Sequence, residues 1–544
     1  MLRPADENQR GQAAPFLRLG TGGRAVAATS AKADLVLHQG VIFGHRDSDS
    51  VAISGGRIVS HGPYSQLKAL VGPSTHLIKL AGRTLAPGFV DAHLHFLEAA
   101  SAVSGFAVWR CRNVADLLAD LRVGAGRTPP GNWLRAFGCD EALLQGKRGP
   151  TRDELDQAVA KNPLRLRHQT LHASWLNTRA INQLGLEAKD FRPPAGATIF
   201  RDGTGRLTGL VVGMEEWLTR QLPLVTNAEL EARARTMSRE LCAAGVTAFT
   251  DATVRNGPEE VALFAKLAAS GAICQRVAMM LGARHLEAAA KSAEVAHAAG
   301  IRMAGLKFMP GAAYDGSTAA RRVRIALSSG LDCAFHATEI EELDEALEAI
   351  ELAQRQIGSA DTPAVCRIEH GGVISPDHIA RIAAARAWVV TDPGFIYFRG
   401  PKYSAEPGLV PHLYRAASLR AAGIELAGAS DAPVTPARPL AGIAAAISRA
   451  TIDGNVIGAD ERLPPADAFA LFTRDAARLQ RLEAGEIAPG MLADMVVLQR
   501  DPMTLNAAEL LALNVDLTLI AGRVVYERGR PAVAHSDSAD LHST

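Results

Sequence analysis

Two histidines, His93 and His95 in the segment DAHLH, follow directly after the apolar run LAPGFV. Side chains alternate across a β-strand, so residues separated by one position lie on the same face. Two imidazole nitrogens on one face can bind a divalent cation together. The spacing therefore predicts the beginning of a metal site, if further ligands stand elsewhere in the chain.

Four more side chains that could bind a metal stand in later apolar runs: Lys307 in GLKFM, His336 in CAFHATE, His370 in CRIEHGG and Asp431 in GASDAPV. Imidazole and carboxylate groups suit one or two divalent metals of borderline softness. A single histidine is more often a core or surface residue than a ligand. Four histidines and one acid at the ends of apolar runs are explained better by a shared metal site.

These side chains can meet only if the apolar runs are parallel strands of one sheet. Short runs rich in Val, Ile, Phe and Ala alternate with segments of helical periodicity, which is typical of βα units. Eight runs are expected to be strands, at residues 85–95, 246–252, 275–281, 302–309, 331–337, 364–370, 387–392 and 424–431. Eight units favour a closed TIM-like (β/α)8 barrel over an open doubly wound sheet, and the carboxyl ends of barrel strands meet at one mouth.

The barrel, with its insertion, is expected to span residues 86–485, and the sequence predicts a second domain beside it. Residues 33–85 and 486–533 both consist of short β-like runs with tight turns, and each is too small to bury a core alone. They are expected to pair into one small β-sandwich domain built from both ends of the chain. Residues 1–32 and 534–544 are expected to be flexible tails.

One connection in the barrel is unusually long. About 150 residues separate the first strand from the second, far more than an ordinary βα loop contains. Residues 97–225 are therefore expected to form a cap over the barrel mouth, and they include aromatic and apolar stretches that could wall a pocket.

Composition excludes several classes of partner. Lys and Arg together number 58 and Asp and Glu 57, which leaves a net charge of +1 and no electrostatic case for nucleic acid or an anionic membrane. No apolar stretch approaches the roughly 18 residues of a membrane span. The six cysteines are scattered without CxxC pairs, so we expect reduced core thiols in a cytoplasmic protein.

Several stretches resemble the amidohydrolase superfamily, and within it the branch, amidohydrolase family 3, that contains N-substituted formamide deformylase. They are HASWLNTRAINQLGL, RIEHGGVISPDHIAR, GASDAPVTPARPLAGIAAAISR and GEIAPGMLADMVVL, and the resemblance covers nearly the whole chain. It implies a distorted (β/α)8 barrel with an HxH pair on the first strand, often a carbamylated lysine on the fourth, histidines on the fifth and sixth, and an aspartate on the eighth. A homo-oligomer is also common in this superfamily.

The residues would then support metal-dependent hydrolysis of an amide, N-formyl or N-acyl bond of a small molecule. Two divalent ions, expected to be zinc, would be bound by the pair His93 and His95 and by the pair His336 and His370, with a hydroxide between them. A carbamate formed by carbon dioxide on Lys307 would bridge the ions. Asp431 would bind metal and also pass the hydroxide's proton to the departing nitrogen.

Other roles are open for several of these residues. Lys307 could instead be an unmodified ammonium paired with Asp315 or Asp431, and Asp431 could cap a helix. His172 in the cap could donate to a carbonyl oxyanion or only to neighbours within the cap. Other cap or loop residues could either line the pocket or have a structural role: Trp175, Asn177, Phe395 and Tyr397. Asp140, Glu215 and Glu216 are expected to be structural or solvent-facing.

Two other functions compete with amide hydrolysis. The first is a deaminase with a single metal that acts on an amidine or an aminated heterocycle. The second is a binding or regulatory protein that keeps the barrel and has lost the chemistry. Retention of the complete ligand set argues against this second alternative.

Overall fold

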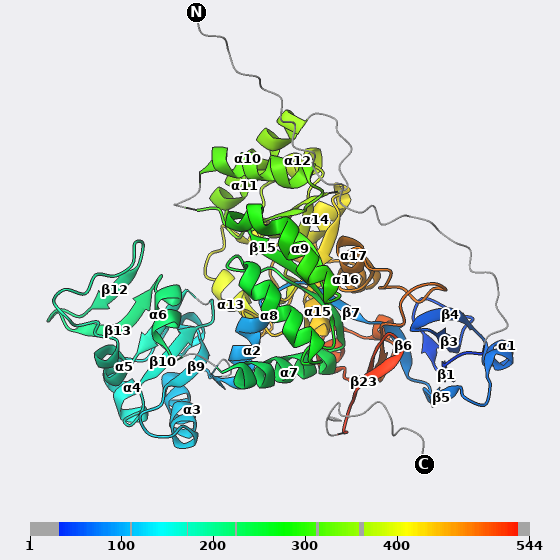
Figure 1. The fold of residues 1–544 in the computed structure, drawn as a ribbon, viewed down its shortest axis with the longest axis horizontal. Coiled ribbons are helices and arrows are strands. Elements are labelled where there is room, and N and C mark those ends of the chain that lie inside the picture. The colour runs from blue at the N-terminus through cyan, green and yellow to red at the C-terminus, as the bar shows by residue number, and fades with distance from the viewer. Residues whose placement is uncertain are drawn as a thin grey trace, which may run out of the picture.

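The centre of the protein is an eight-stranded parallel sheet. The sheet is a nearly closed barrel with its strands in chain order (Figure 1). This computed structural model describes residues 32–108, 111–170, 172–223, 226–311, 315–357 and 364–530. The strands are β7 (Phe89–Leu94), β14 (Val246–Asp251), β15 (Arg276–Gly282), β16 (Arg302–Phe308), β17 (Cys333–Ala337), β18 (Cys366–His370), β19 (Trp388–Thr391) and β20 (Leu426–Gly428). The eight expected strands and the TIM-like barrel are confirmed.

Backbone hydrogen bonds beyond the strand ends join the first and last strands at the mouth of the barrel. The amide of Asp431 donates to the carbonyl of His93 over 2.9 Å, and the amide of His95 donates to the carbonyl of Ala432 over 2.8 Å. The segments that bear the expected ligands are therefore held side by side by the main chain.

Amphipathic helices cover the outside of the barrel. In α11 (Ile340–Ile357), the buried residues Leu343, Leu347 and Ile350 recur every three or four positions, so one face of the helix packs on the sheet. The other principal helices of this layer are α2 (Phe96–Ser104), α7 (Asn227–Ala243), α8 (Pro258–Ala269), α9 (Ala289–Ala298), α10 (Gly316–Ser328), α12 (Pro376–Ala384), α13 (Pro393–Tyr403), α14 (Ala416–Ala421), α15 (Pro439–Ser448), α16 (Pro465–Leu471) and α17 (Arg474–Leu479).

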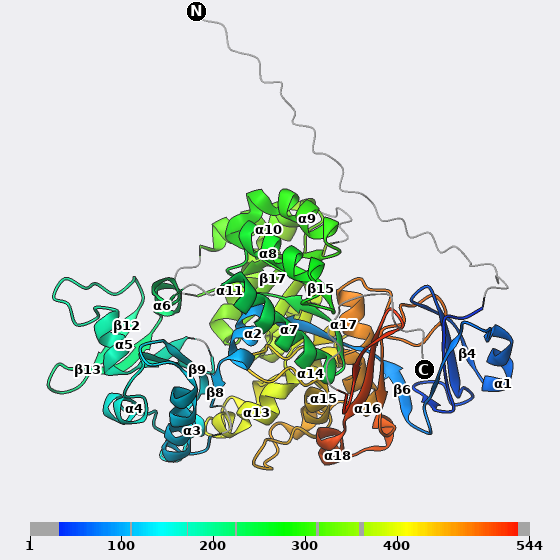
Figure 2. The same cartoon turned by 60° about the horizontal axis from the view of Figure 1, so that its bottom comes forward.

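Both ends of the described chain contribute to a β-sandwich beside the barrel (Figure 2). Leu37, Ile53 and Leu85 from the first end pack with Val497 and Leu519 from the last end in one buried core. One sheet contains β1 (Leu35–His38), β3 (Ser50–Ser54), β4 (Arg57–Gly62) and β5 (His76–Lys79), and the other contains β2 (Val41–Ile42), β6 (Thr84–Pro87), β21 (Met495–Leu498), β22 (Val515–Ile520) and β23 (Arg523–Glu527). The expected composite sandwich is confirmed. The expected tails lie outside the described residues, except for Lys32.

The long insertion after the first barrel strand has a six-stranded sheet of its own and lies against the barrel near α2 and α13 (Figures 1 and 2). It begins later than position 97, because α2 belongs to the barrel layer: the ring of Phe96 stacks on Phe249 of β14 at 5.0 Å. The elements are β8 (Phe106–Ala107), α3 (Val114–Arg127), β9 (Leu134–Cys139), α4 (Arg152–Ala158), β10 (Leu164–His168), β11 (Ala173–Leu176), α5 (Thr178–Gln183), β12 (Thr198–Arg201), β13 (Leu207–Val212) and α6 (Glu215–Gln221). No helix among the described residues combines the length and apolarity that crossing a membrane demands.

Candidate metal centre

His93, His95 and Asp431 meet at the mouth of the barrel. Nε2 of His95 lies 3.0 Å from Oδ1 of Asp431, and Nε2 of His93 lies 3.5 Å from the same oxygen. The other ring nitrogen of His95, Nδ1, is 2.9 Å from the hydroxyl of Thr253. The pair that the HxH spacing predicts on one face therefore does share a face, and the carboxylate of the eighth strand stands beside it.

His336 and His370 stand on the adjacent fifth and sixth strands. Nδ1 of His336 is 3.0 Å from Nε2 of His370, and the ring centroids of His370 and His93 are 4.8 Å apart. One ligand atom each from His93, His370 and Asp431 lies within 4.8 Å of the other two. The structure thus brings the four histidines and the acid together, as the sequence predicts.

Buried carboxylates orient two of these histidines. Nδ1 of His93 donates to Glu369, and Nδ1 of His370 donates to Asp392 over 2.8 Å. An acceptor at Nδ1 places the proton there and leaves the lone pair of Nε2 for a metal. Nε2 of His93 therefore faces Asp431, and Nε2 of His370 faces Nδ1 of His336.

Lys307 of β16 is buried in the same centre, and its side chain is 2% exposed. Its Nζ makes no hydrogen bond within the described residues. Burial lowers the pKa of Lys307 to about 8, although the charges of Glu369 and Asp431 oppose this. Asp315 is not its partner, because that carboxylate is exposed and caps α10 through Ser317 and Thr318.

Among the expected ligands, three buried polar atoms lack hydrogen bonds within the described residues: Nε2 of His93, Nζ of Lys307 and Oδ1 of Asp431. Unpaired buried polar groups are costly and rare, so several in one place call for a missing partner. A divalent cation would satisfy the imidazole nitrogen and the carboxylate oxygen at once, and these are the atom types that such ions prefer. The residues present therefore fit a metal.

The electrostatics of the centre favour metal-binding protonation states of His93 and Asp431. Burial and the charge of Lys307 lower the pKa of His93 to about 3, so that its ring is neutral. Burial alone would raise the pKa of Asp431, but the ring of His95, 3.0 Å away, and the charge of His370 hold it below its usual range. A neutral imidazole and an ionised carboxylate are the forms that coordinate metal.

The backbone is strained at two of the expected ligands. His370 has φ of 69° and Asp431 has φ of 53°, in the left-handed region that non-glycine residues seldom adopt. Such residues cost roughly 1–3 kcal/mol each and persist where the surroundings hold them, often at functional sites. Here the bends lie at or just beyond the carboxyl ends of β18 and β20, where both side chains turn into the mouth.

Cap residues reach the mouth to different extents. His172 is exposed; desolvation lowers its pKa, and the charges of Glu215 and Asp431 oppose this. Asn177, in contrast, caps α5 and bonds to backbone groups within the cap, and Trp175 is buried in the cap core. Among the candidate residues of the cap, only His172 is exposed and also interacts electrostatically with Asp431 of the centre.

Other residues considered from the sequence have structural surroundings. Glu215 is buried and pairs with Arg165, whereas Glu216 is exposed and pairs with Arg220 in the same helix, α6. Phe395 and Tyr397 lie in α13, where an irregular loop was expected. The ring of Phe395 stacks 6.3 Å from that of His370, so Phe395 walls the centre.

A second cluster, in the cap, contains Asp140, Glu141 and His168. The backbone amide of Thr170 donates to Nδ1 of His168 over 3.0 Å, so Nε2 bears the proton and faces Glu141 at 3.4 Å. Because this ring then offers no free nitrogen lone pair to a cation, we interpret the cluster as a hydrogen-bonded group and not as a metal site.

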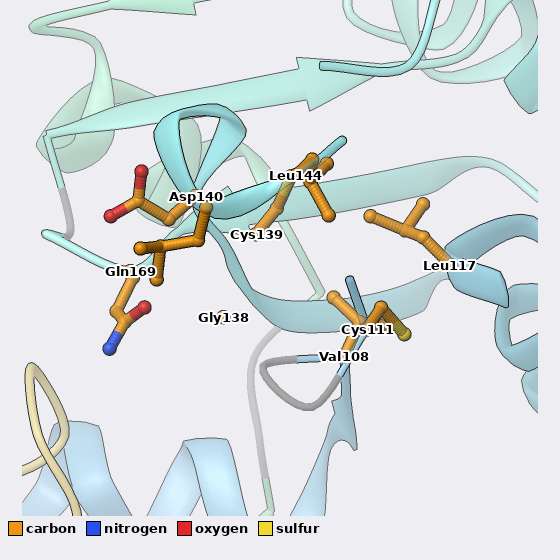
Figure 3. A pocket seen from close by; sticks show the side chains of 9 residues that line it. Val108, Cys111, Leu117, Gly138, Cys139, Asp140, Leu144 and Gln169 are labelled. Carbon is orange, nitrogen blue, oxygen red and sulfur yellow. The ribbon is translucent and has the colours of Figure 1, made fainter. Parts of the chain in front are cut away.

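A cavity of ≈ 10 Å³ lies beside this cluster, with the polar ends of Asp140 and Gln169 on one side and Cys111 and Leu117 on the other (Figure 3). It has room for about one water molecule and not for a substrate. Gln169 also donates to the carbonyl of Val434 over 2.6 Å, which ties the cap to the loop that bears Asp431.

The sequence reasoning missed Glu369, Asp392 and Thr253, the partners of the histidine rings. Two of them carried a signal. Glu369 is a charged residue inside the apolar strand run AVCRIEH, and Asp392 follows the run AWVV at the same end of the sheet as the ligands. A charge in a strand buried on both faces needs a partner, which the mouth supplies.

Comparison with known proteins agrees with the barrel fold. A family described as the amidohydrolase family matches residues 76–526. N-substituted formamide deformylase of Arthrobacter pascens is 25% identical in sequence, over 88% of this chain and 95% of its own length. Putative amidohydrolase YtcJ of Bacillus subtilis is also 25% identical, over 88% of this chain and 96% of its own length. Among solved structures, an uncharacterised metal-dependent hydrolase of Pyrococcus horikoshii superposes with a TM-score of 0.68 at 21% identity, over 87% of this chain and 99% of that one.

Proposed function

The chain belongs to the amidohydrolase family and is a hydrolase of carbon–nitrogen bonds, and from this premise we propose that it cleaves an amide, N-formyl or N-acyl bond of a small molecule. The observation that supports this most directly is the meeting of His93, Lys307 and Asp431, each with an unpaired buried atom, at one mouth. These residues come from the first, fourth and eighth barrel strands, so their meeting is a property of the fold.

Two divalent ions, proposed to be zinc, would be held by the histidine pairs of the first strand and of the fifth and sixth strands. Such ions lower the pKa of water toward about 7 and polarise a carbonyl group. Neutral His93, already oriented by Glu369, and the bent backbone at His370 prepare two of the ligands. This preparation reduces the reorganisation that binding would otherwise require.

Lys307 is proposed to bear a carbamate. An ammonium at this position would be buried without a hydrogen-bonding partner in the described structure, next to two cations, and this is costly. Addition of carbon dioxide to the neutral amine, with loss of a proton, would convert the side chain into an anion able to serve as a further metal ligand. The anion would replace the missing partner of Nζ.

Asp431 is proposed to move the proton. Its Oδ1 lies within 3.5 Å of both first-strand histidines and lacks a hydrogen bond, so it can accept a proton from the attacking water and deliver it to the departing nitrogen. His172, exposed on the cap, is proposed to donate to the carbonyl oxygen of the substrate. Phe395 would exclude water on the side of His370.

A mononuclear deaminase is the second candidate. His93, His370 and Asp431 alone already lie within 4.8 Å of one another, and three such ligands suffice for one ion. The two candidates differ in metal count and in product.

The expected homo-oligomer and cytoplasmic location remain predictions.

The test uses the full-length protein, stripped of metal with a chelator and reloaded with zinc. It is assayed on a panel of formamides and N-acyl amines and on a panel of amidines and aminated heterocycles, with metal counted by elemental analysis. Two ions per chain and metal-dependent release of an amine support the proposal. One ion with release of ammonia from the second panel supports the deaminase. Absence of turnover on both panels contradicts both and favours a non-catalytic protein.

A further inference from the structure

Two cysteines that are remote in the sequence lie side by side on the barrel wall. Cys242 is in the last turn of α7, and Cys274 precedes β15. Their sulfur atoms are 3.0 Å apart, although 32 positions separate them in the chain. All six cysteines are unbonded thiols, and Cys274 is partly exposed whereas Cys242 is buried.

A small polar network holds the two thiols in contact. Ser238 accepts a hydrogen bond from the backbone amide of Cys274 over 3.1 Å, and its hydroxyl lies 3.3 Å from the sulfur of that residue. The side-chain amide of Gln275 donates to the sulfur of Cys242 over 3.0 Å, and Ser238 donates to Gln275 over 2.7 Å. Both sulfur positions are thus fixed, and the S–H group of Cys242 lies where it can donate to a thiolate at Cys274.

Other cysteines lack this arrangement. Cys333 and Cys366 face each other in the register of β17 and β18, but both are buried, and burial raises the pKa of Cys366 to about 12. In contrast, the hydrogen bond with Cys242 lowers the pKa of Cys274 to about 7. Among the residues that the structure describes, no other two sulfurs are in hydrogen-bonding contact. Cys274 therefore combines exposure, a neighbouring thiol and ready ionisation.

We propose that Cys242 and Cys274 form a site of reversible two-electron oxidation, at which a peroxide converts the two thiols into a disulfide. The Cys274 thiolate attacks one oxygen of hydrogen peroxide and becomes a sulfenic acid, while the other oxygen leaves as hydroxide and takes up a proton to become water. The Cys242 sulfur then attacks the Cys274 sulfur, the S–S bond forms, and the sulfenic oxygen leaves as a second water. A reduced dithiol reverses the reaction by thiol–disulfide exchange.

The disulfide would lie where the barrel meets the sandwich. The hydroxyl of Thr518 in β22 donates to the carbonyl of Cys242 over 2.6 Å, and Arg276, two positions after Cys274, forms an ion pair with Asp494. This is the amino-terminal end of the barrel strands, opposite the mouth. The proposal is therefore independent of the proposed catalytic function, and oxidation is expected to leave the metal centre intact.

Full-length protein, treated with hydrogen peroxide and then denatured and alkylated, tests the proposal. Mass spectrometry is expected to show the loss of two alkylatable thiols of the six, a peptide that links Cys242 to Cys274, and recovery of both thiols after dithiothreitol. Cys111→Ala is the matched control and should lose the same two thiols. In Cys242→Ala, the sulfenic acid of Cys274 should persist and react with dimedone.

Two results would overturn the inference. One is that all thiols stay reduced at a peroxide concentration that oxidises free glutathione. The other is a cross-link between Cys274 and a different cysteine of the same or another copy. Because the wild-type peptide map decides between these outcomes, the test does not depend on the folding of either variant.

Discussion

Nδ1 of His93 donates a hydrogen bond to the carboxylate of Glu369, although 276 positions separate the two residues in the chain. Arg367, on the same strand as Glu369, pairs with that carboxylate, with Nη2 2.9 Å from Oε2, and keeps it ionised. An ionised acceptor fixes the proton of His93 on Nδ1 and leaves Nε2 for a cation beside Asp431. The orientation of the first proposed ligand therefore depends on the sixth strand of the barrel.

Glu369→Gln should weaken metal binding without unfolding the barrel. The amide keeps the shape of the side chain but removes the charge that holds His93 in its metal-binding tautomer, and such a loss typically costs about 10–100-fold in metal affinity. Competition with a coloured chelator measures the affinity, and circular dichroism checks the fold. Glu216→Gln, at an exposed ion pair on α6, is the matched control. Unchanged affinity in Glu369→Gln would contradict the positioning role.

Asp431→Asn should lower kcat by about 10²–10⁴-fold, because the amide cannot accept the proton that the carboxylate is proposed to transfer. The comparison is made at saturating zinc, with the bound metal counted, so that loss of chemistry is separated from loss of an ion. Asp190→Asn, an exposed aspartate of the cap, serves as control. Full activity in Asp431→Asn would remove Asp431 from the proposed mechanism.

Lys307→Ala should lose activity and bind fewer ions per chain, since it removes the proposed bridge. It also leaves a cavity at a buried position, which a short carboxylic acid such as propionate can enter with its anionic group toward the ions. We therefore expect propionate to restore part of the activity. Lys291→Ala, on the exposed face of α9, should behave as wild type. An isotopically labelled bicarbonate signal in wild-type protein, absent from Lys307→Ala, would identify the carbamate directly.

The sequence predicts the barrel well because its strands and helices have distinct periodicities. Runs such as AVCRIEH and AWVVTD are short and apolar, and the intervening helices bury one face, as α11 does with Leu343 and Leu347. The HxH pair follows from the alternation of side chains along a strand. Local patterns therefore locate the five proposed metal ligands of imidazole and carboxylate type.

Contacts between side chains of elements that are distant in the sequence could not be predicted in the same way. The partnership of Glu369 with His93 depends on how the sixth strand faces the first across the barrel, and the contact of Cys242 with Cys274 depends on where α7 ends relative to β15. Neither relationship has a periodic or spacing signal, because each joins elements that are separate in the sequence. The sequence predicted scattered reduced core thiols, and for that reason it did not indicate that two of them are in contact.

Glu98 links the barrel to the cap. It lies in α2, and its carboxylate pairs with Arg167 of β10 at 3.0 Å and with Arg255, which follows β14. Burial alone would raise the pKa of Glu98, but the two guanidinium groups lower it to about 2. A carboxyl group whose pKa is lower in the folded than in the unfolded state stabilises the fold above its unfolded pKa, near 4.5, and loses that contribution as the pH falls toward 2.

Glu98→Gln should therefore destabilise the protein by about 3 kcal/mol at pH 7, from a shift of about 2.5 pKa units at 1.36 kcal/mol each. The difference from wild type in the free energy of unfolding should stay constant between pH 7 and about pH 5.5 and shrink below pH 4.5. Below that pH, Glu98 of the unfolded wild-type chain takes up a proton while Glu98 of the folded protein stays ionised, which favours unfolding of the wild type. Urea unfolding at a series of pH values measures it, with Glu216→Gln as the exposed control. A difference that does not depend on pH would mean that Glu98 stabilises the contact between barrel and cap by packing and not by charge.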